Sequence, residues 1–194
     1  MFDLKTLRTS LFLAFVLGML GGCNTVLDVV KKDQIETNLN KRSYGARLDD
    51  STIETVVEHN IEKAHESLKD AHIEVDSFNA VVLLTGEVPN EEVRSLAAQT
   101  AQEVANVRIV HNELTVRGNS SFMSRTNDSY IHTKIKFNLS REPDLDGTDI
   151  DVIVQDSVAF LMGLVTQEQS ETAAHVASLT SGVRRVVKIF EYID

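Results

Sequence analysis

The chain contains one cysteine, Cys23, and therefore a single thiol. It follows a basic start (Lys5, Arg8) and an uncharged, apolar run over residues 11–20. That run has the length of a signal-peptide core, whereas a helix that crosses a bilayer needs about 20 apolar residues. The sequence therefore predicts a signal peptide ahead of Cys23.

The residues Leu20-Gly21-Gly22-Cys23 resemble the lipobox of bacterial lipoproteins. The resemblance implies that residues 1–22 are removed and that the sulfur of Cys23 carries lipid. The next residue is Asn24 rather than Asp, which by the sorting rule of that family implies the periplasmic face of the outer membrane. A lipidated Cys23 leaves no thiol for disulfides, metal binding or catalysis. The alternative is an ordinary signal peptide that happens to precede a cysteine.

Other chemistry that residue patterns can reveal is missing from the sequence. The six histidines show no metal-ligand spacing, and the chain has no glycine-rich phosphate loop, serine elbow or paired-carboxylate motif. The formal net charge of −10 argues against a nucleic-acid-binding protein. We therefore expect no metal, no cofactor and no enzymatic activity.

One predicted helix, beginning near Asn127, combines aromatic and basic side chains. Its core stripe would be Ile131, Ile135 and Leu139. Beside this stripe, at spacings of four, three and four residues, lie Tyr130, Lys134, Phe137 and Arg141, with Lys136 further round. An aromatic ring that prefers the headgroup level, next to cations that attract phosphate, is typical of an interfacial helix. The predicted phospholipid site consists of Tyr130, Ile131, Lys134, Lys136, Phe137 and Arg141. The alternative places Phe137 in the core and the basic residues on a solvated face.

The segment that carries this helix is the second copy of a repeat. Residues 73–75 and 81–88 return as residues 150–152 and 158–165, about 77 residues later. Ala97-Ala98 returns as Ala173-Ala174 at a spacing shorter by one, so one residue is missing near residues 166–170. The sequence therefore predicts two copies of one supersecondary unit.

Within each copy the periodicity predicts the order α-β-β-α-β, a two-layer α+β unit of about 70 residues. Asp50 and Asp128 offer side-chain oxygens suited to capping the first helices, and Asn79 and Asp156 mark the turns between the first two strands. We expect a tether over residues 23–48, domains over residues 49–117 and 125–194, and a linker over residues 118–124. Units this small have marginal cores, so we expect the two to dock.

This order of elements resembles the BON domain over most of residues 44–194. The resemblance rests on Asp49-Asp50 with Ile53-Glu54, on residues 127–131 and on residues 160–166. A tandem pair behind a lipobox is similar to the dual-BON-domain outer-membrane lipoproteins. That similarity implies a non-enzymatic protein that binds anionic phospholipid, phosphatidylglycerol above all, through the first helix of its second domain. It also implies a role in outer-membrane integrity and enrichment at division sites.

An acidic run on the first helix supports a second hypothesis. Glu54, Glu58, Glu62 and Glu66 follow one another at helical spacing. We interpret them as a solvated face, and the alternative is a docking face for a protein partner. The protein would then be an adaptor that docks envelope-assembly partners or regulators of cell-wall hydrolases. Binding of a small solute is a third possibility.

Overall fold

The computed structural model describes residues 41–69, 71–117, 122–145 and 149–194, all of which belong to one compact unit. The predicted signal peptide, Cys23 and most of the predicted tether lie outside these residues. Within the described ranges, no helix is both long and apolar enough to cross a membrane.

The first copy of the repeat forms a four-stranded mixed sheet with helices packed on one face. Its elements are α3 (Tyr44–Ala64), α4 (Glu66–Lys69), β1 (His72–Phe78), β2 (Val81–Val88), α5 (Glu91–Gln102), β3 (Ile109–Asn112) and β4 (Thr115–Val116). β1 pairs with β2 in antiparallel fashion, and β3 and β4 both pair with β2 in parallel. The third predicted strand is therefore present in two short pieces.

The second copy repeats this order with an unbroken last strand. Its elements are α6 (Phe122–Leu139), the short 3-10 helix η1 (Pro143–Leu145), β5 (Ile150–Gln155), β6 (Val158–Val165), α7 (Gln167–Leu179) and β7 (Arg185–Tyr192). β5 pairs with β6 in antiparallel fashion and β7 pairs with β6 in parallel, so the strand order is β5-β6-β7. The predicted α+β class and the duplicated α-β-β-α-β order are confirmed.

The turns lie where the sequence predicted them. Asn79 and Asp156 have positive φ angles of 51° and 50° at the tips of the β1–β2 and β5–β6 hairpins. The missing residue lies in the turn between the second strand and the second helix. Two residues, the second of them the helix cap Asn90, separate β2 from α5, whereas Thr166 alone separates β6 from α7.

The starts of the first helices differ from the prediction. α3 begins at Tyr44, where the Ser43 hydroxyl accepts a hydrogen bond from the Ala46 N–H, and α6 begins at Phe122. The ends of the predicted tether and linker are thus helical, and the predicted capping role of Asp50 and Asp128 is wrong. Both aspartates lie inside their helices and instead hold the hairpin turns.

The reason is that a tight hairpin turn leaves backbone N–H groups without a strand partner. The Asp50 carboxylate accepts hydrogen bonds from the N–H groups of Asn79 (2.9 Å) and Ala80 (2.8 Å). The Asp128 carboxylate accepts the equivalent pair from the β5–β6 turn, both at 2.8 Å. One carboxylate in each domain therefore joins the first helix to the first hairpin.

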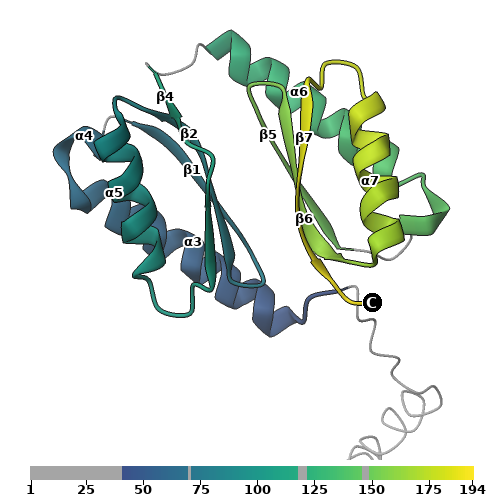
Figure 1. The fold of residues 1–194 in the computed structure, drawn as a ribbon, viewed down its shortest axis with the longest axis horizontal. Coiled ribbons are helices and arrows are strands. Elements are labelled where there is room, and N and C mark those ends of the chain that lie inside the picture. The colour runs from purple at the N-terminus through teal and green to yellow at the C-terminus, as the bar shows by residue number, and fades with distance from the viewer. Residues whose placement is uncertain (1–40, 70, 118–121, 146–148) are drawn as a thin grey trace, which may run out of the picture. The chain divides into compact units, whose positions relative to one another are not determined.

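Three apolar clusters hold the described residues together. Two of them lie inside the domains, between each sheet and its own helices. The third lies between the sheets and consists of Phe78, Val81, Leu83, Ile153, Phe160, Met162 and Ile189. The two sheets therefore pack face to face, with helices on the outer faces (Figure 1). The domains dock as expected, because each supplies one side of a shared core.

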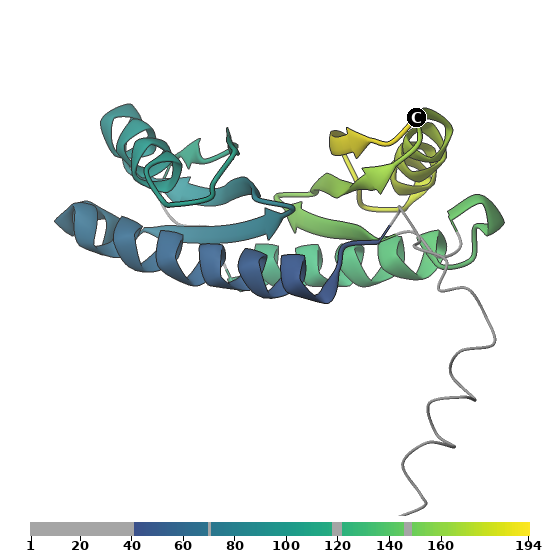
Figure 2. The ribbon, with the colours of Figure 1, turned by 90° about the horizontal axis from the view of Figure 1, so that it is seen from below.

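Helices α3 and α6 lie along the same side of this unit, and α5 and α7 lie at the opposite side (Figure 2). Equivalent helices of the two domains thus contribute to one common surface. The chain enters the described fold at the start of α3, on this same side.

Candidate functional site

The predicted apolar stripe of helix α6 packs into the core and sets the orientation of the helix. Ile131, Ile135 and Leu139 are buried against the second sheet and α7. Gly182 has a φ of +104°, and a Cβ at this position would lie only 2.8 Å from Cγ1 of Ile131. The buried stripe and the close approach of Gly182 to Ile131 therefore determine which face of α6 points outward.

The outward face carries two exposed aromatic rings, each with a cation above it. Tyr130 is 63% exposed and Phe137 is 58% exposed. The Lys134 Nζ lies 5.2 Å from the centroid of the Tyr130 ring, and the Arg141 guanidinium carbon lies 5.3 Å from that of Phe137. Both distances are within cation–π range. Phe137 is thus a surface residue, and we call Tyr130, Lys134, Phe137 and Arg141 the α6 strip.

Two residues of the predicted site do not belong to this strip. Ile131 is 1% exposed, so it supports the helix from below and cannot contact a ligand at the surface. Lys136 projects from the other flank of α6, where its Nζ donates a hydrogen bond to the Ile150 carbonyl at 2.9 Å. Its ammonium group is therefore directed toward β5, away from the two rings.

Nothing in the sequence pointed to the end of α7 as a neighbour of the strip. The Lys134 Nζ donates to the Ser181 carbonyl (3.4 Å), and the Asn138 amide donates to the Thr180 hydroxyl (3.0 Å). These bonds hold the loop after α7 against α6, and Leu179, the last residue of α7, is largely exposed. Only the tertiary fold brings the end of α7 and its loop to helix α6.

The other flank of α6 lines a groove between the two domains. A hollow of about 420 Å³ is lined from the first domain by Glu74 and Asp76, and from the second by α6 and β5. An adjoining hollow adds Glu54 and Lys136. Burial, and then the nearby carboxylates of Glu74 and Glu54, raise the pKa of Asp76 to about 7.

The acidic run on the first helix does not form one continuous face. Glu58 and Glu62 are exposed on α3, and Glu66 is exposed on the separate helix α4. Glu54 is partly buried and accepts a hydrogen bond from the Ser77 N–H at 2.8 Å. Its pKa is raised, chiefly because of burial, even though this hydrogen bond acts in the opposite direction. Glu54 is therefore part of the domain interface.

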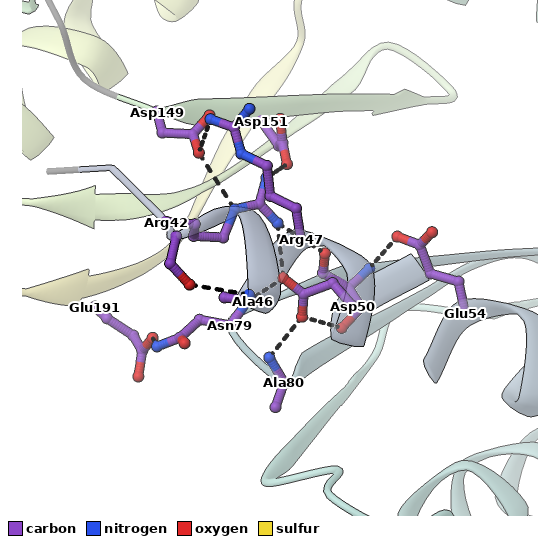
Figure 3. Close-up of polar contacts among 12 residues, drawn as sticks. Arg42, Ala46, Arg47, Asp50, Glu54, Asn79, Ala80, Asp149, Asp151 and Glu191 are labelled. Atoms are coloured by element: carbon purple, nitrogen blue, oxygen red, sulfur yellow. Dashed lines mark hydrogen bonds and ion pairs between the residues drawn. The ribbon is translucent and has the colours of Figure 1, made fainter. Parts of the chain in front are cut away.

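A buried arginine connects the two domains where the chain enters α3 (Figure 3). The Arg42 guanidinium bonds to Asp50 at 2.9 Å in the first domain, and to Asp151 at 2.8 Å and Asp149 at 3.3 Å in the second. It also lies 3.7 Å from the centroid of the Phe78 ring. Burial alone would raise the pKa of Asp50, but hydrogen bonds from the turn, from a serine hydroxyl and from Arg42 hold it below its ordinary value.

No group of three or more His, Cys, Asp or Glu side chains in the described ranges is arranged to hold a metal ion.

Comparison with known proteins gives the family. The model of the BON domain matches residues 49–118 and 127–194. The outer membrane lipoprotein DolP of Haemophilus influenzae is 39% identical over 79% of both chains. A 21 kDa hemolysin of Actinobacillus pleuropneumoniae is 30% identical over 79% of both chains. The osmotically-inducible protein Y of Escherichia coli is 28% identical over 79% of this chain and 76% of its own. The chain therefore belongs to the BON-domain family, as an outer-membrane lipoprotein of the DolP type.

Proposed function

We propose that this lipoprotein, anchored through Cys23 at the periplasmic face of the outer membrane, binds anionic phospholipid through the α6 strip. The observation that carries the proposal is the pairing of each exposed ring with a cation, Tyr130 with Lys134 and Phe137 with Arg141. A ring can enter the boundary between headgroups and acyl chains while its cation meets a phosphate. Phosphatidylglycerol, an anionic lipid, fits this chemistry.

The expected strength of this contact is modest. Each cation near an anionic surface contributes about 1 kcal/mol, and burial of the exposed half of each ring contributes about 1 kcal/mol more. The sum, about 4 kcal/mol, corresponds to a dissociation constant of about 1 mM. Such a contact is weak for a free protein. It becomes effective for a protein that a lipid anchor already holds at the membrane, because the anchor raises the local concentration.

Flotation with liposomes tests the proposal. A protein of residues 24–194 retains all three apolar clusters and lacks the lipid anchor. It should float with vesicles that contain phosphatidylglycerol and not with neutral vesicles. Tyr130→Glu and Phe137→Glu should weaken flotation by placing a charge at the acyl boundary, and Lys134→Glu should do so by reversing an attraction that salt screens. Glu58→Lys on α3 is the matched control and should not lower flotation.

Circular dichroism must show that each variant is folded. Folded Tyr130→Glu and Lys134→Glu proteins that float as the wild type does would refute the α6 site. That result would favour the adaptor hypothesis, for which exposed Glu58 and Glu62 on α3 offer a docking face.

In the cell, we propose that this contact supports outer-membrane integrity and concentrates the protein at division sites. A fluorescent fusion of the full chain should gather at midcell, and the same fusion with Tyr130→Glu should spread evenly over the envelope. Strains that carry only the Tyr130→Glu form should become permeable to large antibiotics. Unchanged distribution and permeability would separate lipid binding from both roles.

A further inference from the structure

The start of α3 carries an exposed apolar pair that the proposed function does not use. Tyr44 is 78% exposed, the highest value among the large hydrophobic side chains of the described residues, and Leu48 is 53% exposed. The two are one helical turn apart, so their side chains lie next to each other on one face. The exposed cations Lys41 and Arg47 are close to them in sequence, and the half-exposed Arg47 also pairs with Asp149 at 3.1 Å.

Leu48 and Phe137 are displaced from the buried stripes of their own helices by similar rotations about the helix axis. Leu48 precedes the buried Ile53 by five residues, which places it about 140° round the helix. Phe137 follows the buried Ile131 by six residues, which places it about 120° round in the same sense. Helices α3 and α6, which carry the two exposed sets, lie along the same side of the unit (Figure 2).

The position of the pair along the chain indicates what covers it. About 20 residues separate Tyr44 from Cys23, and a chain of that length reaches at most about 70 Å. The first turns of α3 are thus the part of the described fold that is nearest in sequence to the proposed lipid anchor. A phenol ring and an isobutyl group beside two cations suit an anionic membrane surface.

We infer that Tyr44 and Leu48 form a second membrane contact, so that both domains lie on the anionic bilayer through α3 and α6 together. This inference rests on the proposed function, because it assumes that the α6 strip faces the membrane. It adds that the first domain, despite its acidic residues, contacts lipid at the start of α3. Two contacts on one rigid unit fix its orientation, which a single contact would leave free to rotate.

The chain has no tryptophan, so a single introduced tryptophan reports on one position. We would make Tyr44→Trp, Tyr130→Trp and Tyr192→Trp in the protein of residues 24–194. Tyr192 is 48% exposed and ends β7, at the side opposite to α3 and α6 (Figure 2), so it is the matched control. The probe is a vesicle that contains phosphatidylglycerol with brominated acyl chains, which quench tryptophan on contact.

The inference predicts a blue shift and quenching for Tyr44→Trp and Tyr130→Trp, and neither effect for Tyr192→Trp. Quenching of Tyr130→Trp without quenching of Tyr44→Trp would overturn the inference and leave the α6 site intact. Absence of quenching at both positions would overturn the proposed function as well. Equal quenching at all three positions would indicate an unfolded, adsorbed chain and would also overturn the inference.

A second measurement gives the size of the contact. Leu48→Ser should weaken partition into phosphatidylglycerol vesicles about five-fold, because a half-exposed leucine loses its apolar burial. Ile109→Ser removes a side chain of similar exposure on β3 and should leave partition unchanged. Equal partition of the Leu48→Ser and Ile109→Ser proteins would refute the second contact.

Discussion

Replacement of Arg42 by glutamine should weaken the docking of the two domains more than any other change of a single charge at their interface. The Arg42 side chain is 9% exposed and joins Asp50 to Asp151 and Asp149. Arg42→Gln would leave three carboxylates close together without their shared cation. Both the lost attraction and the new repulsion disfavour the docked state.

The magnitude follows from the burial of each partner. Removal of one partner from a buried ion pair destabilises a protein by about 3–5 kcal/mol. The side chain of Asp151 is 42% exposed, so water can solvate this carboxylate after the change. We therefore expect Arg42→Gln to lower the free energy of unfolding by about 2–4 kcal/mol. Arg47→Gln is the control: Arg47 is half exposed and, within the described residues, forms its ion pair with Asp149, so we expect about 0–1 kcal/mol.

Urea unfolding followed by circular dichroism measures both values, and amide hydrogen exchange in β2 and β6 reports on the core between the sheets. Arg42→Gln should accelerate exchange in these strands, and Arg47→Gln should not. A double-mutant cycle with Asp151→Asn should give a coupling energy of about 1–3 kcal/mol. If Arg42→Gln destabilises the protein no more than Arg47→Gln does, the role of Arg42 at the interface is refuted.

Three further predictions concern the fold. Because the folded-state pKa of Asp76 is about 7, above its ordinary value, the folded protein should lose stability as the pH rises from about 4 to 7, and Asp76→Asn should remove this slope in pH-dependent thermal melts. Gly182→Ala should destabilise the second domain by at least about 1 kcal/mol in urea, because its Cβ would clash with Ile131 at a positive φ; an unchanged midpoint would contradict this. Asp128→Ala should cost about 2–3 kcal/mol in the same assay by leaving two turn N–H groups without an acceptor, whereas an exposed control, Asp144→Ala, should have little effect.

The sequence was sufficient for the features that depend on neighbouring residues. Helical spacing identified Ile131, Ile135 and Leu139 as buried, and residues that tolerate positive φ identified the hairpin turns. The shortened repeat located the missing residue in the turn before α7. Each of these features is encoded within a few positions, so one sequence contains the whole signal.

Features that depend on distant partners could not be predicted. The capping rule assigned a local role to Asp50, but its carboxylate bonds to N–H groups 29 and 30 residues away. Arg42 lies in a polar stretch whose composition predicts a tether. Two of its partners, Asp149 and Asp151, are more than 100 residues away. The helical wheel placed Lys136 apart from the strip, but only the docking of the domains shows that its flank faces the groove. Tertiary contacts determine the roles of all three residues.

The groove also explains how one duplicated unit can have two different surfaces. The first helices align with Asp50 on Asp128, which makes Glu54 on α3 equivalent to His132 on α6, and Glu58 equivalent to Lys136. Glu54, His132 and Lys136 line the same hollow between the domains. Two identical copies would place carboxylates against carboxylates there, and such like charges repel. One flank of α6 carries basic residues where α3 carries acidic ones. This difference therefore favours pairing of the first domain with the second over pairing of two copies of the same domain. Because this complementarity uses only the flank that faces the groove, the opposite flank of α6 remains open for the rings and cations of the α6 strip.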